Sequence, residues 1–265
     1  MGGTAKGLPR GKSRDRTHSH HNNANAARCL PGAGATSIIR TPTRMTKFKA
    51  LLFDLDGTLL DTIEDLTDSM NAALARLGFP GHSVEACKQL VGEGIEHFAA
   101  SALPSEQSRN EAMVARCVRL MREEYRKRWA AKTHPYDGIA ELLDALAGRG
   151  LRLAVLSNKA DDFTKMMVSH FLPGWRFATV VGAKPGVARK PDPAPALRVA
   201  EELKLGPGEI LFLGDTKTDM ETARAAGMYP VGALWGFRSA EELLASGARS
   251  LIRRPDELLS LIDAR

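Results

Sequence analysis

The stretch that most constrains the fold of this chain covers residues 50–61 and reads ALLFDLDGTLLD. Its apolar run, Ala50 to Phe53, ends at Asp54, a pattern typical of a strand buried inside a parallel sheet. In open α/β sheets, active sites lie just beyond the carboxyl ends of such strands. Asp54 and Asp56 are two residues apart, so an extended backbone points both carboxylates the same way, and Gly57 allows a sharp turn after them. The pair can therefore act as a nucleophile and a general acid/base.

Four further apolar runs predict strands, and helical segments separate them. We place these strands at residues 151–156, 177–181, 210–213 and 229–234. The helices between and after them are expected at residues 139–147, 161–171, 194–203, 219–226, 240–246 and 255–264. Strands that alternate with helices predict an α/β fold, a doubly wound (Rossmann-like) parallel sheet with right-handed crossovers.

The block of helices between the first two strands is predicted to be an inserted cap domain. Apolar residues recur every three or four positions from Ile63 to Leu77, the spacing of an amphipathic helix. Ser83 can cap a second helix, and a short third helix is expected from Ile95 to Leu103. A long fourth helix is expected to open at Pro104-Ser105 and to run past Tyr125. The predicted domains are a helical cap over residues 62–134 and an α/β core over residues 46–61 and 135–265.

Residues 1–45 form a basic tail that we predict to be disordered, because it lacks apolar periodicity. Residues 1–44 hold eight Lys and Arg residues against one acidic residue, whereas residues 45–265 hold 29 against 30. The formal charge of +6 therefore comes from the tail, and a near-neutral body argues against a nucleic-acid-binding surface. Three explanations of the tail stay open: an extension that arises from the choice of start site upstream of Met45, an organelle transit peptide, or a basic arm for anionic partners.

The cysteines and the lengths of the apolar runs indicate in which compartment the protein is expected. Cys29, Cys87 and Cys117 are too few and too widely spaced for a zinc pattern or a disulfide framework, so a reducing compartment is expected. No apolar run approaches the ~18 residues of a membrane span. We expect a cytoplasmic protein that acts without a membrane, or an organellar one if the tail is a transit peptide.

Four polar motifs lie at or beside the predicted strand ends. Residues 54–61 read DLDGTLLD, Ser157 lies in VLSNK, Lys190 lies in RKPDP, and residues 214–219 read GDTKTD. In this order they match the motifs of the haloacid dehalogenase-like (HAD) hydrolase superfamily, which the chain therefore resembles. The nearest resemblance is to the phosphoglycolate phosphatase-like branch. It covers residues 48–240 and also rests on VGEG at residues 91–94, YDG at 136–138 and SNK at 157–159.

The resemblance implies a role for each motif residue. It implies a Mg²⁺ ion held by Asp54, the Asp56 backbone carbonyl and Asp215, with Asp219 as a direct ligand or as a residue that orients a metal-bound water. Asp54 is implied as the nucleophile that forms an aspartyl phosphate, Asp56 as the acid/base, and Lys190 as the cation that offsets the charge of a phosphate. The residues implied to bind phosphoryl oxygens or the leaving group are Thr58, Ser157, Asn158, Gly92, Glu93 and Gly94.

Several functions stay open within this resemblance. We expect a phosphatase for a small phosphomonoester, with 2-phosphoglycolate as the best single substrate. The alternatives are a phosphatase for amino-sugar phosphates or pyrophosphate, a sugar phosphomutase, and a catalytically idle binding module. Asp56 argues against a dehalogenase, because the superfamily's dehalogenases lack this residue. The absence of Lys from residues 62–81 argues against a phosphonoacetaldehyde hydrolase.

Four further residues have ordinary structural interpretations. Glu93 is expected to be a helix cap, His97 to be partly buried, Trp235 to pack, and Lys159 to be a solvated residue at a helix start. The expected partner is a small phosphorylated metabolite. No nucleic acid is expected to bind, and the assembly is expected to be a monomer or a homodimer.

Overall fold

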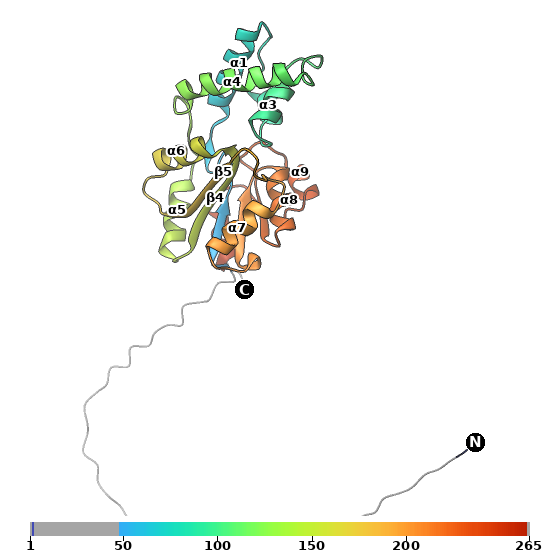
Figure 1. The fold of residues 1–265 in the computed structure, drawn as a ribbon. Helices are drawn as coiled ribbons and strands as arrows, with labels where there is room; N and C mark the ends of the chain where they lie inside the picture. The colour runs from blue at the N-terminus through green and yellow to red at the C-terminus, as the bar shows by residue number, and fades with distance from the viewer. Residues whose placement is uncertain (1, 3–47, 264–265) are drawn as a thin grey trace, which may run out of the picture. The chain divides into compact units, whose positions relative to one another are not determined.

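A computed structural model describes residue 2 and residues 48–263, so the predicted tail, residues 1–45, lies outside the described residues except for Gly2. The main sheet has six strands in the order β5-β4-β1-β6-β7-β8, and every neighbouring pair is parallel. Its strands are β1 (Ala50–Phe53), β4 (Arg152–Ala160), β5 (Phe177–Ala183), β6 (Ile210–Gly214), β7 (Tyr229–Ala233) and β8 (Ser250–Ile252) (Figure 1). The predicted α/β fold with a doubly wound sheet is confirmed.

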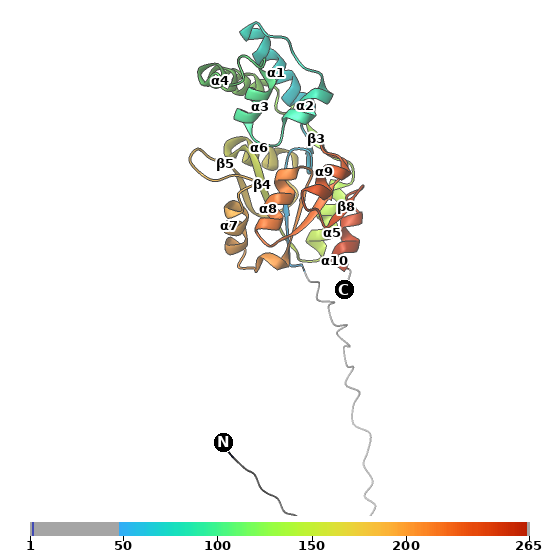
Figure 2. The ribbon, with the colours of Figure 1, turned by 90° about the vertical axis from the view of Figure 1, so that its right-hand side faces the viewer.

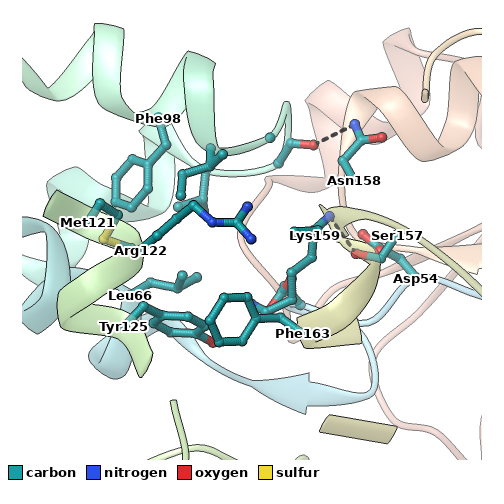
Figure 3. Close-up of a pocket in the computed structure, with 16 residues that line it drawn as sticks. Asp54, Leu66, Phe98, Met121, Arg122, Tyr125, Ser157, Asn158, Lys159 and Phe163 are labelled. Carbon is teal, nitrogen blue, oxygen red and sulfur yellow. Dashed lines mark hydrogen bonds and ion pairs between the residues drawn. The ribbon is translucent and has the colours of Figure 1, made fainter. Parts of the chain in front are cut away.

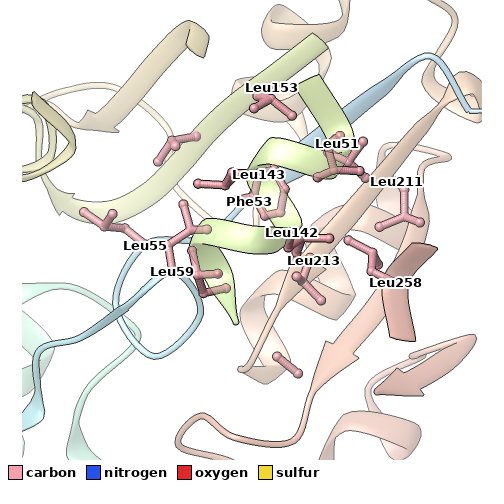
Figure 4. Close-up of a cluster of buried hydrophobic side chains, with 14 of the residues drawn as sticks. Leu51, Phe53, Leu55, Leu59, Leu142, Leu143, Leu153, Leu211, Leu213 and Leu258 are labelled. Atoms are coloured by element: carbon pink, nitrogen blue, oxygen red, sulfur yellow. The ribbon is translucent and has the colours of Figure 1, made fainter. Parts of the chain in front are cut away.

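Strand β1 lies inside the sheet, between β4 and β6, and all four of its side chains are fully buried. Its residues alternate between two apolar clusters. Leu51 and Phe53 join the cluster drawn in Figure 4, whereas Ala50 and Leu52 join a second cluster on the other face. Both faces of the strand are covered, which explains why the sequence reads as an unbroken apolar run rather than as an alternating one.

Helices cover both faces of the sheet. These helices are α5 (Ile139–Gly148), α6 (Asp161–Phe171), α7 (Ala194–Glu202), α8 (Lys217–Ala225), α9 (Ala240–Ala245) and α10 (Glu257–Asp263), with a short 3₁₀ turn at Pro207–Glu209. Residues of α5, α6 and α10 pack with Leu51 and Phe53, and residues of α7 and α8 pack with Ala50 and Leu52. Figure 2 shows α7 and α10 on opposite sides of the strands.

The segment between β1 and β4 forms a separate bundle at one end of the sheet (Figure 1). Its helices are α1 (Ile63–Leu77), α2 (Val84–Leu90), α3 (Ile95–Ala102) and α4 (Glu111–Arg128). They share an apolar cluster that includes Met70, Phe98 and Met121, and Phe163 and Phe237 of the core join it. The Ser83 hydroxyl accepts a hydrogen bond from the backbone N–H of Ala86 at 3.2 Å, which is the predicted cap of the second helix.

The two chain crossings between the bundle and the sheet lie side by side. Strand β2 (Leu60–Asp61) pairs antiparallel with β3 (His134–Pro135). Close to this pair, the buried Asp65 carboxylate accepts hydrogen bonds from the backbone N–H groups of Lys132 and Thr133 and from the Thr133 hydroxyl, at 2.7–3.1 Å. One side chain near the start of α1 therefore ties together the entry and the exit of the bundle.

The structure corrects the predicted helices and strands in the cap, beside the cap and at the sheet edge. Helix α4 begins at Glu111, not at Pro104-Ser105, because the Asn110 side chain caps it by accepting from the Met113 N–H at 3.1 Å. Residues 104–110 form hydrogen-bonded turns instead. The analysis also missed the edge strand β8 and the β2–β3 pair, which are too short to show a period. Within residues 48–263, no helix has the length and apolar character needed to cross a membrane.

Candidate active site

Asp54 lies at the carboxyl end of β1 and is buried. Its Oδ1 atom accepts a hydrogen bond from the Leu55 N–H at 2.7 Å and lies 2.8 Å from the Lys190 ammonium. Gly57, three residues on, has a φ of +83°, and a Cβ at this position would collide with the Asp215 carboxylate. The glycine therefore permits both the turn and the close approach of the fourth motif.

The Lys190 ammonium bridges two carboxylates. It lies 2.8 Å from Asp54 Oδ1 and 2.6 Å from Asp219 Oδ1, and its side chain is only 1 % exposed. Burial alone would lower the pKa of Lys190, but the charges of Asp219 and Asp54 outweigh burial and raise it above its ordinary value. Lys190 is therefore a fixed positive charge throughout the neutral pH range.

Three buried carboxylates converge beside this lysine. Oxygen atoms of Asp54, Asp215 and Asp219 all lie within 4.8 Å of one another. Asp215 accepts from the Thr58 hydroxyl at 2.8 Å and from the Phe237 N–H at 2.9 Å. The Thr216 hydroxyl and N–H hold Asp219 Oδ2 at 2.6 and 3.0 Å. These hydrogen bonds fix the orientations of the Asp215 and Asp219 carboxylates.

The charges of this cluster do not balance without a cation. Burial, followed by the charge of Asp219, raises the pKa of Asp54 to about 7. Burial and the charges of Asp54 and Asp219 raise the pKa of Asp215 well above its usual range. Three carboxylates against one ammonium leave excess negative charge in a buried place, and their oxygen donors suit a hard divalent cation. The residues present therefore fit a Mg²⁺ ion.

Asp56 points to a different partner. Its Oδ1 atom lies 2.8 Å from the Lys159 ammonium, which also lies 4.6 Å from the centre of the Tyr125 ring. The Lys159 side chain is only 8 % exposed, so its interpretation as a solvated helix start is wrong. Strand β4 continues beyond the apolar run to Ala160, so Lys159 lies beside the active-site carboxylates instead of in solvent.

Ser157 and Asn158 both lie next to the carboxylates. Ser157 is buried, and its hydroxyl accepts from the Lys159 N–H at 3.2 Å. The Asn158 amide nitrogen donates to the carbonyls of Gly92 and Lys190 at 3.1 and 2.9 Å. The Asn158 side chain therefore links the second and third motifs to the cap. The Thr58 hydroxyl donates its hydrogen bond to Asp215. Direct binding of phosphoryl oxygens by Thr58, Ser157 and Asn158 stays a prediction.

Comparison with known proteins tests the resemblance. Residues 51–233 match the family model described as haloacid dehalogenase-like hydrolase. The phosphoglycolate phosphatase of Nitrosospira multiformis is 31 % identical over 216 residues, which are 81 % of this chain and 95 % of that protein. The N-acetylmuramic acid 6-phosphate phosphatase of Pseudomonas aeruginosa is 32 % identical over 218 residues, which are 82 % of this chain and 96 % of that protein.

A solved structure agrees with these relatives. The crystal structure of a predicted phosphoglycolate phosphatase from Haemophilus somnus superposes with a TM-score of 0.76 at 27 % identity, and it covers 82 % of this chain and 99 % of that one. The chain belongs to the haloacid dehalogenase-like hydrolases. Within them it is a phosphoric monoester hydrolase of the phosphoglycolate phosphatase-like branch.

The loop Gly92-Glu93-Gly94 of this HAD phosphatase rests directly on the core. Besides the bond from Asn158 to the Gly92 carbonyl, Glu93 Oε1 lies 2.9 Å from the Lys217 ammonium at the start of α8. The hydrogen bond from Lys217 lowers the pKa of Glu93. The expectation that Glu93 is a helix cap is wrong, because Glu93 pairs with the core and the N-cap residue of α3 is Gly94.

A single arginine fastens the other side of this loop. The Arg238 guanidinium donates to the carbonyls of Lys88, Gln89 and Val91, with the Val91 bond at 2.7 Å. These carbonyls lie at the end of helix α2, where the last turn has no partners of its own. Sequence analysis missed Arg238, Asp65 and Thr216. Arg238 and Asp65 lie outside every motif. Thr216 lies inside GDTKTD, and its position as the N-cap of α8 could have been predicted from the Thr-x-x-Asp spacing.

Between the cap and the core, the HAD phosphatase has a pocket of which Asp54 and Asp56 form the polar floor. Leu66, Phe98, Met121 and Tyr125 line its cap side, and Phe163 lines its core side (Figure 3). His97 does not line this pocket, and its side chain is 42 % exposed. The Trp235 indole packs against the core cluster and donates to the Thr58 carbonyl at 3.0 Å.

Proposed function

We propose that this protein is a Mg²⁺-dependent phosphatase that hydrolyses a small phosphomonoester through an aspartyl-phosphate intermediate. The observation that carries this proposal is the buried Asp54 carboxylate, which lies 2.8 Å from the Lys190 ammonium and within 4.8 Å of carboxylate oxygens of Asp215 and Asp219. Asp54 also forms part of the floor of the pocket under the cap. A nucleophile, a cation site and a leaving-group pocket thus meet at one strand end.

The residues divide the reaction into two balanced steps. Asp54 attacks phosphorus and forms a new O–P bond while the bond from phosphorus to the leaving oxygen breaks, and Asp56 gives its proton to that oxygen. Asp56 then takes a proton from water, which attacks the aspartyl phosphate, so that Asp54 leaves as a carboxylate and inorganic phosphate is released. Lys190 offsets negative charge as the phosphate dianion approaches, and Lys159 holds Asp56 beside the pocket. When bound, Mg²⁺ would supply further positive charge at the phosphoryl oxygens.

For the substrate we propose 2-phosphoglycolate first. The Nitrosospira relative is named for this activity, and its match spans nearly its whole length. The name of the Pseudomonas relative makes a 6-phosphate of N-acetylmuramic acid the second candidate. Both compounds are phosphomonoesters of carboxylic acids. We further propose that the protein is cytoplasmic and that its binding partner is this small metabolite.

A phosphate-release screen tests the proposed function. Purified protein is incubated with a panel of metabolite phosphates that includes both candidates, with MgCl₂ and with MgCl₂ plus excess EDTA. We expect release from 2-phosphoglycolate that EDTA abolishes. Conversion of a sugar 1-phosphate to its 6-phosphate without release would identify a mutase, and no conversion of any compound would support an idle binding module.

We predict that Mg²⁺ stabilises the metal-free protein more at pH 8 than at pH 6. The pKa of Asp54 is raised from 3.8 to about 7 in the folded state, so between these values the folded protein binds more protons than the unfolded chain. Metal-free stability therefore falls as pH rises through this window, and the ionised carboxylates bind the cation. Differential scanning fluorimetry at both pH values measures the shift in Tm. An equal shift at both values would contradict the prediction, and the Asp215→Asn variant, which lacks one ligand, serves as the control.

We predict that Gly94→Val impairs substrates that need the cap loop. Gly94 has a φ of +96°, and a Cβ there would lie 2.8 Å from Arg189 Nη1. Valine strains the loop, so kcat/KM for 2-phosphoglycolate should fall roughly 10- to 100-fold, in line with the cost of mispositioning. Acetyl phosphate, which needs only the core, should lose much less.

The matched control for this loop is Gly78→Val. Gly78 also lies in the cap with a positive φ of 81°, but apart from its chain neighbours no atom of the described residues lies within 4 Å of its Cβ position. Equal losses for both substrates in Gly94→Val, with an unchanged circular dichroism spectrum, would show that the loop has a structural role alone.

A further inference from the structure

The leaving group of a phosphomonoester would lie on the cap side of the pocket. Asp54 attacks phosphorus from the core, and in-line displacement places the leaving oxygen on the opposite side. The cap lines this space with two glycines, five apolar side chains, Tyr125 and Arg122. Among the described residues, Arg122 is the only charged one that the cap contributes to this lining.

The Arg122 guanidinium is poised to bind an anion in this space. Figure 3 shows it extending from α4 across the pocket, past Phe98 and toward Lys159, and its Cζ atom lies 5.8 Å from the centre of the Phe163 ring. Within residues 48–263 its only hydrogen bond goes to Asp162 Oδ2, at 3.1 Å. Asp162 is 59 % exposed and does not line the pocket. Of the five N–H donors of arginine, most are therefore left for a ligand.

Among the described residues, Lys159 is the only other cation that lines the pocket, and Lys217 and Arg189 lie outside its lining. Lys159 pairs with Asp56 at 2.8 Å, Lys217 with Glu93 at 2.9 Å, and Arg189 with Glu96 at 2.8 Å. A second anion on the substrate, besides the phosphoryl group, would thus meet Arg122 first. The planar guanidinium fork matches the two oxygens of a carboxylate, and the apolar walls strengthen such a pair by excluding water.

The walls also limit the rest of the leaving group. Leu66, Ile95, Phe98 and Met121 offer no side-chain hydrogen-bond donor or strong acceptor, so sugar hydroxyls that face these walls would lose their hydrogen-bond partners. The volume of the cavity is about 80 Å³. An engineered apolar cavity of about 150 Å³ holds benzene, so this space suits a leaving group of only a few non-hydrogen atoms.

We infer that Arg122 is a specificity-determining residue that binds the carboxylate of the leaving group. The substrate class is phosphomonoesters of small hydroxy carboxylic acids whose remaining atoms are hydrocarbon. This inference rests on the proposed function. It favours 2-phosphoglycolate, or the same compound with one added methyl group, 2-phospholactate, over an N-acetylated amino-sugar phosphate.

The test compares 2-phosphoglycolate with its carboxamide, in which an uncharged amide of nearly equal size replaces the carboxylate. The wild type should prefer the carboxylate in kcat/KM. Arg122→Gln should lower kcat/KM for 2-phosphoglycolate by roughly 10- to 100-fold, the loss expected for a hydrogen-bonded charge pair, and should change the carboxamide by less than about 3-fold.

Two control variants separate recognition from structure. Arg119→Gln removes an arginine one turn earlier on α4, which is 62 % exposed and pairs with Glu123, and it should change neither substrate. Asp162→Asn removes the protein partner of Arg122 and should keep or increase the carboxylate preference. If Asp162→Asn reproduced the loss seen in Arg122→Gln, or if Arg122→Gln lowered both substrates equally, Arg122 would only fasten the cap to the core and the inference would be overturned.

A binding measurement distinguishes this inference from the proposed function. Calorimetry on an Asp54→Asn background compares the Kd values of the same two compounds with and without Arg122→Gln, where no turnover is needed. A carboxylate preference that depends on Arg122 would support the inference even if the enzyme released no phosphate. Phosphate release without any such preference would overturn the inference and leave the phosphatase assignment in place.

Discussion

The Asp54→Asn variant should lose at least roughly 10³-fold in kcat, in the range seen when a covalent catalyst is removed. Asparagine keeps the shape of the side chain but removes the negative oxygen that attacks phosphorus. Asp54 forms part of the floor of the pocket and lies 2.8 Å from Lys190. Among the described residues that line the pocket, no other carboxylate combines these positions, because Asp56 pairs with Lys159 instead.

The same substitution should not weaken the fold. The pKa of Asp54 is raised to about 7 by burial and by the charge of Asp219, so its ionised form destabilises the metal-free protein at pH 8. A neutral amide removes both the cost of burying the charge and the repulsion from Asp219. We therefore expect the metal-free Tm at pH 8 to stay the same or rise.

Phosphate release and thermal unfolding, measured on one preparation, check both expectations. The control is Asp256→Asn, the same chemical change at a side chain that is 65 % exposed and does not line the pocket. If a tenth of the wild-type activity remained, in protein shown by mass spectrometry to be free of deamidation, Asp54 would not be the nucleophile.

Replacing Lys190 with methionine should damage both activity and stability. The substitution removes the ammonium that lies 2.8 Å from Asp54 and 2.6 Å from Asp219, and it keeps a side chain of similar length. Loss of one preorganised charge at a developing anion typically costs about 10²- to 10³-fold in kcat, and we expect a loss in this range for 2-phosphoglycolate.

The stability of the Lys190→Met variant should depend on pH. Breaking a buried ion pair by removing one partner costs about 3–5 kcal/mol, and we expect a loss of this order at pH 8 without metal. The loss should shrink at pH 6, because Asp54, whose pKa is already about 7 beside Lys190, can then take up a proton.

Urea unfolding at both pH values, with EDTA present, measures this difference. Lys165→Met is the matched control, because Lys165 pairs with Asp161 but is 53 % exposed. Equal stability losses at pH 6 and pH 8 would show that Lys190 contributes by packing rather than by balancing the charge of the carboxylates.

The order of elements in the core could be predicted from the sequence because burial leaves a local signature. Ala50 to Phe53 are apolar without interruption because both faces of β1 are covered, and Asp161–Phe171 is a helix with the expected bounds. The start of α4 could not be read in this way. The turns of residues 104–110 are too short to show a period, and a single side chain, Asn110, sets the first residue of the helix.

By itself, the sequence determined the alternating α/β core, the inserted helical segment and the order of the four motifs, because each depends on residue types at fixed local spacing. Only the tertiary structure decided which side chains meet. Lys159 and Asp56 are 103 residues apart in the chain, and their pairing depends on β4 lying next to β1. The contacts of Asn158 with Gly92 and of Arg122 with Asp162 depend on where the cap rests on the core. No local pattern encodes such contacts, since a charged residue near a helix start or on a helix face looks solvated until another element is packed against it.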